Sequence, residues 1–226
     1  MSGSEPATSP GGTPAPEARW PVVLTVIAVL VIAAGMPDRL MLLPYWAPFA
    51  VAIVALAPMA GVALGSDKRR WLRIERVVLL AVAIFVLGLT VTALATLIRH
   101  IIIGGPERLG GLELLTSSVV AWVVNVAGFA LLFWQMDAGG PLGRLTGEDA
   151  PRDWMFPQAG GGDGAPAWLP GYVDYLYLAF STATAFSSTD VMPLTARAKV
   201  LMMMEATIAL VTMVVVASRA INVLGS

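Results

Sequence analysis

Five long apolar runs dominate the sequence and constrain its fold more than any other feature. They cover residues 20–36, 45–64, 77–98, 112–134 and 200–224. Most of them approach the roughly 20 residues that an α-helix needs to cross the hydrocarbon core of a bilayer. The composition agrees, because 57% of the residues are hydrophobic and only 13% are charged. The sequence therefore predicts an all-α integral membrane protein with five transmembrane helices in contact with the lipid bilayer.

Two polar segments flank these runs. Residues 1–19 are rich in Pro, Gly, Ser, Thr and Ala, so we expect a disordered tail. The tail lacks a positive n-region, which indicates that the first run is a retained span and not a signal peptide. Residues 137–171 carry so much Gly and Pro that we expect a loop without regular structure, with Trp154, Phe156 and Trp168 resting on the membrane surface. The expected divisions are the tail (1–19), a four-helix region (20–136), the loop (137–171) and a C-terminal region (172–226).

A short apolar segment, residues 172–186, precedes the last run. It has 15 residues, and a helix of that length covers only about 22 Å. It is therefore either a thin span or a re-entrant, pore-like helix that turns back within the membrane. The sequence leaves both alternatives open.

The basic residues orient the chain. Five of them lie in "SDKRRWLRIER", residues 66–76, and the positive-inside rule places this cluster in the cytoplasm. The N-terminal tail and the 137–171 loop then share that side. If residues 172–186 turn back, ten of the 14 Lys and Arg residues are cytoplasmic, and if they cross, nine are. Both counts predict a multi-pass protein of the cell membrane with a cytoplasmic N-terminus.

Several function classes are disfavoured by composition. A net charge of −1 does not suggest a nucleic-acid partner. The chain has no cysteine and a single histidine, His100, so thiol catalysis and multi-histidine metal sites are excluded. No serine–histidine–aspartate set or phosphate-binding loop is visible. We expect neither a catalytic site nor a metal or cofactor, and therefore no enzyme.

The stretch "STATAFSSTDVMP", residues 181–193, resembles the pore helix and selectivity filter of the potassium-channel superfamily. Aligned without gaps on T-V-G-Y-G-D, Asp190 falls on the filter aspartate and Pro193 on the following proline. The two filter glycines correspond to Ser187 and Thr189, and the tyrosine to Ser188. Because such a filter needs glycine conformations that threonine resists, the resemblance implies a degenerate pore module that is not potassium-selective.

The whole chain also resembles a bacterial membrane family of unknown function, the domain of unknown function numbered 1345. The shared pattern is two spans, a basic loop, two more spans, a Gly/Pro-containing loop, and "D-Y/F-L-Y-x-A/S-F-T…S-x-T/S-D" before a last helix. The matching residues are Asp174, Tyr175, Leu176, Tyr177, Ala179, Phe180, Ser188, Asp190 and Asn222. This resemblance implies a fold and a bacterial cytoplasmic membrane, but no activity.

Asp190 is the first candidate for an ion site. It follows an expected helix C-terminus, where the helix dipole favours cations, and nearby hydroxyls could complete a polar vestibule. Those hydroxyls belong to Thr184, Ser187, Ser188 and Thr189. The alternative is that "SSTD" forms a turn and an N-cap for the last helix.

Glu205 is the second candidate, because an ionisable residue inside an apolar helix is a functional hypothesis by default. Helical spacing places it on one face with Thr212 and with Met202, Ala209, Val216 and Arg219. That face is expected to line an inner cavity or a subunit interface. The alternative is a structural hydrogen bond from Glu205 to a neighbouring helix or loop.

These observations favour a channel-like or transporter-like membrane protein. A homo-oligomer and a monovalent cation are its candidate partners. A non-conducting scaffold or accessory subunit is the alternative from another class. The sequence names neither the transported species nor the gating stimulus.

Overall fold

The structure is a computed structural model, and it describes residues 17–34, 43–103, 111–147, 150–160, 168–184 and 190–224. These residues are mainly helical, which confirms the all-α class. Four described helices are long and apolar enough to cross a membrane, and their apolar stretches begin at residues 47, 68, 115 and 196. The first helix is apolar but shorter. The helices are α1 (Trp20–Ala34), α2 (Ala47–Leu64), α3 (Lys68–Ile103), α4 (Gly111–Met136), α5 (Gly140–Thr146), α6 (Tyr172–Thr184) and α7 (Ala196–Leu224).

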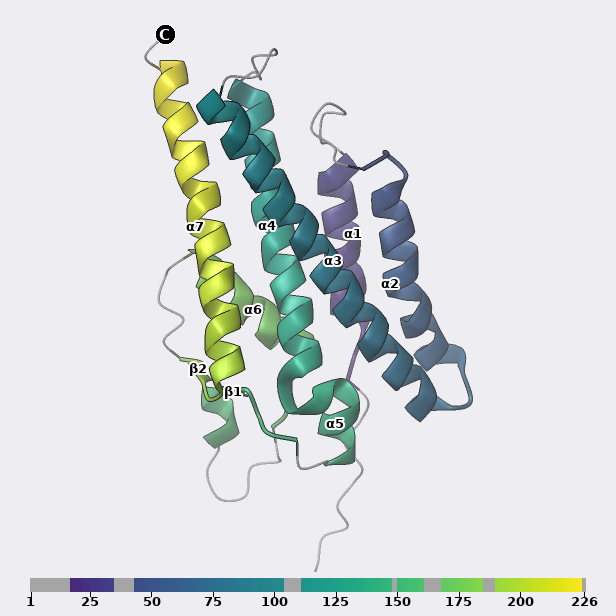
Figure 1. Cartoon of the computed structure of the whole chain (residues 1–226). Helices are drawn as coiled ribbons and strands as arrows, with labels where there is room; N and C mark the ends of the chain where they lie inside the picture. Colours follow the sequence, from purple (N-terminus) through teal and green to yellow (C-terminus); the bar gives the residue numbers. More distant parts are fainter. Residues whose placement is uncertain are drawn as a thin grey trace, which may run out of the picture.

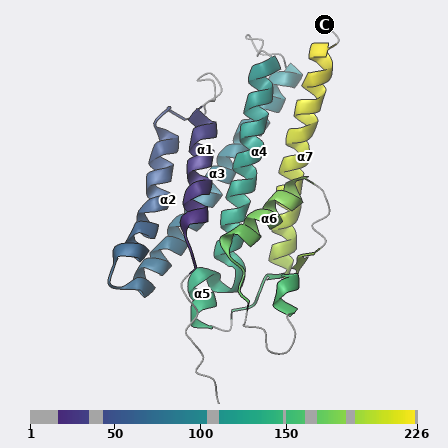
Figure 2. The same ribbon diagram turned by 180° about the vertical axis from the view of Figure 1, so that it is seen from behind.

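Helix α4 is the centre of the bundle. Helices α1, α2 and α3 lie on one side of it, and α6 and α7 lie on the other (Figures 1 and 2). Its second half is almost wholly buried, including Phe129, Phe133 and Trp134 at 1% exposure or less. Phe133 contacts Trp154 with ring centroids 4.7 Å apart. The hydrophobic core therefore follows α4 toward its C-terminal end.

The basic cluster differs from the expected loop, because α3 already begins at Lys68. The backbone N–H of Arg70 donates to the side chain of Asp67 at 3.1 Å, which satisfies one free donor of the first turn. Trp71 packs against Gly61 and Gly65 of the preceding α2 end. The sharp α2–α3 connection thus depends on two glycines that leave room for one indole ring.

The segment 137–171 was expected to lack regular structure, and this prediction is wrong for much of it. It contains η2 (Asp137–Gly139), α5, β1 (Trp154–Met155) and η3 (Pro157–Gly160). Positive φ angles at Ala138, Gly139 and Gly140 turn the chain sharply from α4 into α5. The glycines therefore permit a tight turn between helices and do not mark an unstructured loop.

The aromatic residues of this segment are also not on the surface as expected. Trp154 is 1% exposed and Phe156 is 4% exposed, and Trp168 is half-buried against Phe156 at 5.7 Å. Phe156 also contacts Tyr175 of α6 at 5.3 Å. These rings are buried because the segment folds back under α4, α6 and α7, which gives them a protein core to fill.

Helix α6 does not traverse the bundle. The antiparallel pair β1–β2 joins Trp154 to Pro193, with β2 spanning Met192–Pro193. The chain therefore returns, after α6, to the segment that precedes α6. Figure 2 shows α6 rising diagonally beside α4 and α7 from the end where α5 lies. Residues 192–193 thus lie again at the end of the bundle from which α6 starts.

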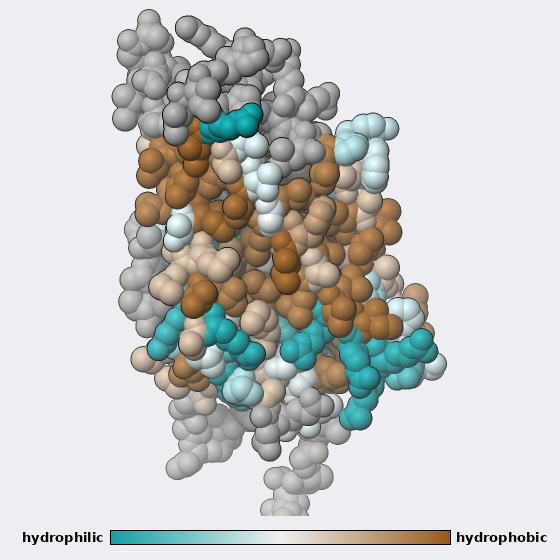
Figure 3. Space-filling model, in the orientation of Figure 1, coloured by the Kyte–Doolittle hydropathy of each residue, from teal (hydrophilic) through white to brown (hydrophobic). Residues whose placement is uncertain are grey.

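The described surface has two zones. Figure 3 shows hydrophobic side chains across the middle of one face and hydrophilic ones near the end where α5 lies. Large apolar side chains are exposed on several helices, among them Ile53 at 69%, Ile84 at 64% and Leu210 at 64%. Such a continuous apolar surface suits contact with lipid more than contact with water.

Replacing Gly61 by Ala is expected to loosen the α2–α3 connection. The added Cβ would lie 2.2 Å from Cε3 of Trp71, so the free energy of unfolding should fall by about 1–3 kcal/mol. Gly88→Ala is the matched control, because a Cβ there meets nothing within 4 Å. Thermal unfolding in detergent measures both, and an equal melting temperature for the two variants would contradict the packing argument.

Candidate functional site

A buried polar network holds the base of α6. Asp137 lies where α4 ends, and its carboxylate is 1% exposed. It accepts hydrogen bonds from the backbone N–H of Asp153 at 2.6 Å and from the Tyr175 hydroxyl at 2.5 Å. A weaker bond comes from the N–H of Trp154 at 3.4 Å. One carboxylate therefore joins the end of α4, the strand before α6, and α6 itself.

A second buried carboxylate joins this base to α7. Asp153 is fully buried and accepts two bonds from the Arg197 guanidinium, at 2.6 and 2.7 Å. It also accepts the Thr195 hydroxyl at 2.5 Å. Thr195 in turn accepts the backbone N–H of Ala198 at 3.2 Å and so caps α7. The paired, two-pronged geometry is the strong form of the arginine–carboxylate interaction.

The N-terminal segment belongs to the same network. Glu17 accepts hydrogen bonds from the Trp134 indole and from the backbone N–H of Tyr172, both at 2.7 Å. It also pairs with Arg144 at 3.3 Å. The expected tail therefore ends in an ordered contact at residues 17–19, and residues 1–16 lie outside the described part.

Arg144 links the two halves of this network. Its Nη1 donates to the carbonyl oxygens of Trp134 and Asp137, both at 3.0 Å. Its guanidinium also lies 5.3 Å from the centroid of the Tyr175 ring, within the range of a cation–π contact. Glu17 thus pairs with Arg144 and Asp153 with Arg197, whereas N–H and hydroxyl donors hold the Asp137 carboxylate; this arrangement favours a role in positioning α6.

Glu205 is different, because its carboxyl group is buried and has no partner. The residue is 0% exposed, and neither carboxyl oxygen has a hydrogen-bond partner among the described residues. The neighbouring polar group on α4 is Asn125, whose Nδ2 lies 3.5 Å from the Glu205 backbone oxygen. The Asn125 Oδ1 also lacks a partner. The α4–α7 interface therefore holds three buried side-chain oxygens without a hydrogen-bond partner among the described residues, two from Glu205 and one from Asn125.

This pair lies deep in the bundle. Glu205 follows the start of α7 by nine residues, which is about 13 Å along a helix. Trp122, one turn from Asn125, contacts Phe180 of α6 at 5.6 Å between ring centroids. The C-terminal part of α6 therefore packs beside α4 at nearly the depth of Asn125.

The structure does not gather the predicted site residues into one pocket. Thr184, at the end of α6, donates to the carbonyl of Phe180 at 2.9 Å, and Asp190 is exposed. Thr212 is 2% exposed and donates to the Ile208 carbonyl at 2.8 Å. Residues Ser187, Ser188 and Thr189 lie outside the described residues, so the predicted vestibule stays a prediction.

The buried face of α7 is the one that helical spacing predicted. Glu205, Ala209 and Thr212 are all buried, and the face packs against α4 within one chain. Of the candidate site residues that are described, Thr212 alone lines a cavity of about 600 Å³ between α1, α2, α3 and α4. Among the described residues, no group of three or more His, Cys, Asp or Glu side chains is placed to hold a metal ion.

The network at the base of α6 was missed by sequence reasoning. Asp137 and Asp153 lie in a segment that was expected to be irregular, and Glu17 lies in the expected tail. The available signal was position, because Asp137 lies three residues after one apolar run and Arg197 lies three residues before another. Charges at the ends of spans are common on membrane surfaces, so position alone did not indicate pairing.

Comparison with known proteins identifies no relative. No protein-family model, curated protein or solved structure matches this chain. The resemblances to the bacterial family of unknown function and to the potassium-channel pore module therefore stay predictions.

Asp153→Ala is expected to release α7 from the base of α6. The change leaves Arg197 without its carboxylate partner and Thr195 without its acceptor, so the free energy of unfolding should fall by about 2–3 kcal/mol. Arg152→Ala is the control, because Arg152 is exposed and adjacent in sequence. Chemical unfolding in detergent compares the two, and a control that loses as much stability as Asp153→Ala would rule out the pairing as the cause.

Proposed function

We propose that the protein is a multi-pass protein of the bacterial cytoplasmic membrane. Helices α1, α2, α3, α4 and α7 are its five spans, and α6 is a re-entrant helix that enters from the cytoplasm. The apolar exposed surface and the four long apolar helices support the membrane location. The basic start of α3 lies at the same end as α5 and the N-terminal segment, and this supports a cytoplasmic N-terminus.

Single cysteines test this topology directly, since the chain has none of its own. Arg152→Cys and Lys199→Cys, one on each side of α6, should both be labelled by an impermeant maleimide only after permeabilisation. Tyr45→Cys, which is 74% exposed between α1 and α2, should be labelled in intact cells. Labelling of residues 152 and 199 from opposite sides would show that α6 crosses the membrane, against the proposal.

The proposed activity is channel-like or transporter-like passage of protons or monovalent cations, with Glu205 as the ion-binding group. The observation that carries this proposal is the carboxyl group of Glu205, which is fully buried with no hydrogen-bond partner among the described residues. Burying an unpaired polar group costs free energy. Such residues within membrane spans are therefore rare and mark proton or ion pathways.

The neighbours of Glu205 suit a small cation. The Asn125 side-chain oxygen supplies a second ligand atom of the hard, oxygen type that such cations prefer. Phe180 and Trp122 bring the end of α6 close to this depth. The C-terminal carbonyls of a helix carry partial negative charge, so α6 would attract cations toward the pair.

A homo-oligomer is proposed because α7 has an exposed apolar face in addition to the face that packs against α4. The opposite face of α7 exposes Met203, Met204, Leu210, Met213 and Val214 at 50% or more. Met-rich surfaces adapt readily to different partners. This face is available to a second copy of the chain or to lipid.

The variant Glu205→Gln is expected to conduct poorly. The change removes the ionisable group and keeps the side-chain volume, so proton or monovalent-cation flux into loaded vesicles should fall at least tenfold. Asp67→Asn, an exposed change at the basic end, should leave flux intact. Vesicles with wild-type protein that leak no faster than empty vesicles would refute the transport proposal.

A stability measurement separates an ion site from a structural hydrogen bond. Glu205→Met replaces an unpaired carboxyl by an apolar side chain of similar length, so the melting temperature should rise by several degrees. The same variant should lose flux, as expected where a functional site is held at a cost in stability. A lower melting temperature would instead mean that Glu205 has a structural partner.

A non-conducting scaffold or accessory subunit is the second candidate. One observation favours it: the buried network of Asp137, Asp153, Arg144 and Arg197 fixes α6 against α4 and α7. A helix held this firmly is suited to presenting a surface as well as to forming a pore entrance. Normal folding together with absence of flux would favour this candidate.

A further inference from the structure

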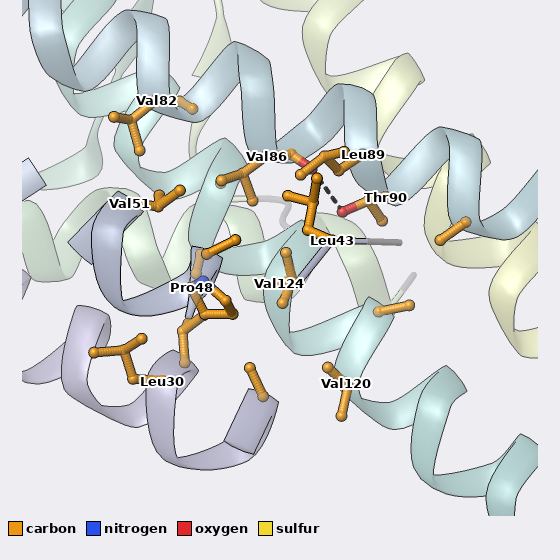
Figure 4. Close-up of a pocket in the computed structure, with 18 of the residues that line it drawn as sticks. Leu30, Leu43, Pro48, Val51, Val82, Val86, Leu89, Thr90, Val120 and Val124 are labelled. Atoms are coloured by element: carbon orange, nitrogen blue, oxygen red, sulfur yellow. Dashed lines mark hydrogen bonds between the residues drawn. The ribbon is translucent and has the colours of Figure 1, made fainter. Parts of the chain in front are cut away.

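A cavity in the bundle is distinct from the Glu205 site. It lies between α1, α2, α3 and α4, with Thr212 as the contribution of α7. Its volume is about 600 Å³, within the range of sites that hold small molecules. Figure 4 shows labelled side chains from four helices around one space, among them Leu30, Pro48, Val86 and Val120.

The wall of this cavity is mainly apolar, and its hydroxyl groups already have partners. No charged side chain is among its described lining residues. Hydroxyl groups of the wall donate to carbonyls of their own helices, at 2.8 to 3.0 Å; they are Thr25, Thr90, Thr96 and Thr212. Ser117 and Ser118, the remaining hydroxyls, also have partners.

Water is therefore a poor occupant. A buried water needs two to four polar partners, and a cavity that offers few of them stays dry. An empty space of this size would leave the lining side chains without contacts on one side. The favoured occupant is a hydrocarbon chain, which needs no hydrogen bond from the wall.

The position of the cavity indicates where such a chain would come from. Its wall uses the first half of α2 and the second half of α3, from Leu43 to Ala55 and from Val82 to Leu97. These halves lie at the end of the bundle away from the basic start of α3. Arg99, exposed two residues beyond Leu97, places a positive charge near the same end.

We propose that this cavity binds one acyl chain of a phospholipid from the leaflet opposite the basic cluster, with Arg99 near the lipid phosphate. The chain fills the apolar space, and the headgroup stays at the membrane surface. The two parts of the ligand explain the two features of the site: an apolar wall without free hydrogen-bond donors, and a cation beside it. The proposal rests on the proposed membrane location and topology, and it is independent of ion transport.

Two matched pairs of variants test it. Val120→Trp fills the cavity, whereas Val119→Trp is its control, because Val119 is 50% exposed on the same helix. Ala93→Leu narrows the cavity from α3 by a smaller change, with exposed Ala95→Leu as its control. The four variants and Arg99→Gln are purified in detergent, stripped of lipid and titrated with dioleoyl phosphatidylglycerol. Native mass spectrometry counts the bound lipid.

Wild type, Val119→Trp and Ala95→Leu should each retain one lipid. Val120→Trp and Ala93→Leu should bind the lipid at least fivefold more weakly than wild type, and Arg99→Gln should bind it severalfold more weakly. Equal retention in the filled and control variants would overturn the proposal. The cavity would belong to another occupant if wild type bound a different apolar molecule, or a second copy of the chain, and only the filled variants lost it. That result would overturn the proposal, and unchanged lipid binding in Arg99→Gln would also overturn it.

Discussion

The rest of the structure depends on two buried carboxylates, Asp137 and Asp153. Each is at most 1% exposed, and each would be costly to bury alone. The N–H of Asp153 and the Tyr175 hydroxyl bind Asp137, and Arg197 binds Asp153, so both carboxylates have hydrogen-bond donors. Removal of one partner would leave the other buried and unsatisfied, so the contacts among α4, α6 and α7 are maintained together.

This base explains why a short helix can be held inside a bundle of long ones. Helix α6 has 13 residues, too few to cross the hydrocarbon core. Residues 192–193 return to pair with residues 154–155, which precede α6, and the buried backbone N–H groups beside α6 need acceptors from the protein. Asp137, Asp153 and Glu17 provide those acceptors, and Trp154 and Phe156 cover them with an apolar layer.

The sequence predicted the long helices well and the base poorly, for a physical reason. A long apolar run in a membrane has one favourable structure, the helix, so composition alone locates it. The segment 137–171 folds through long-range pairs such as Asp153 with Arg197, and no local pattern encodes such a pair. Gly139 and Gly140 suggested irregular structure, although they serve a tight turn.

Glu205 could be identified from the sequence, because the free-energy cost of placing a carboxyl group in an apolar helix can be recognised from that helix alone. A carboxyl group nine residues into an apolar helix is conspicuous whatever packs around it. The sequence could not determine whether this carboxyl group has a partner, and the structure places Asn125 against the Glu205 backbone. The contrast with Asp137 and Asp153 supports the proposed site. Those two buried carboxylates accept hydrogen bonds, whereas neither carboxyl oxygen of Glu205 has a hydrogen-bond partner among the described residues. Because such a group is costly to bury without a partner, the proposal of a proton or cation site rests on Glu205.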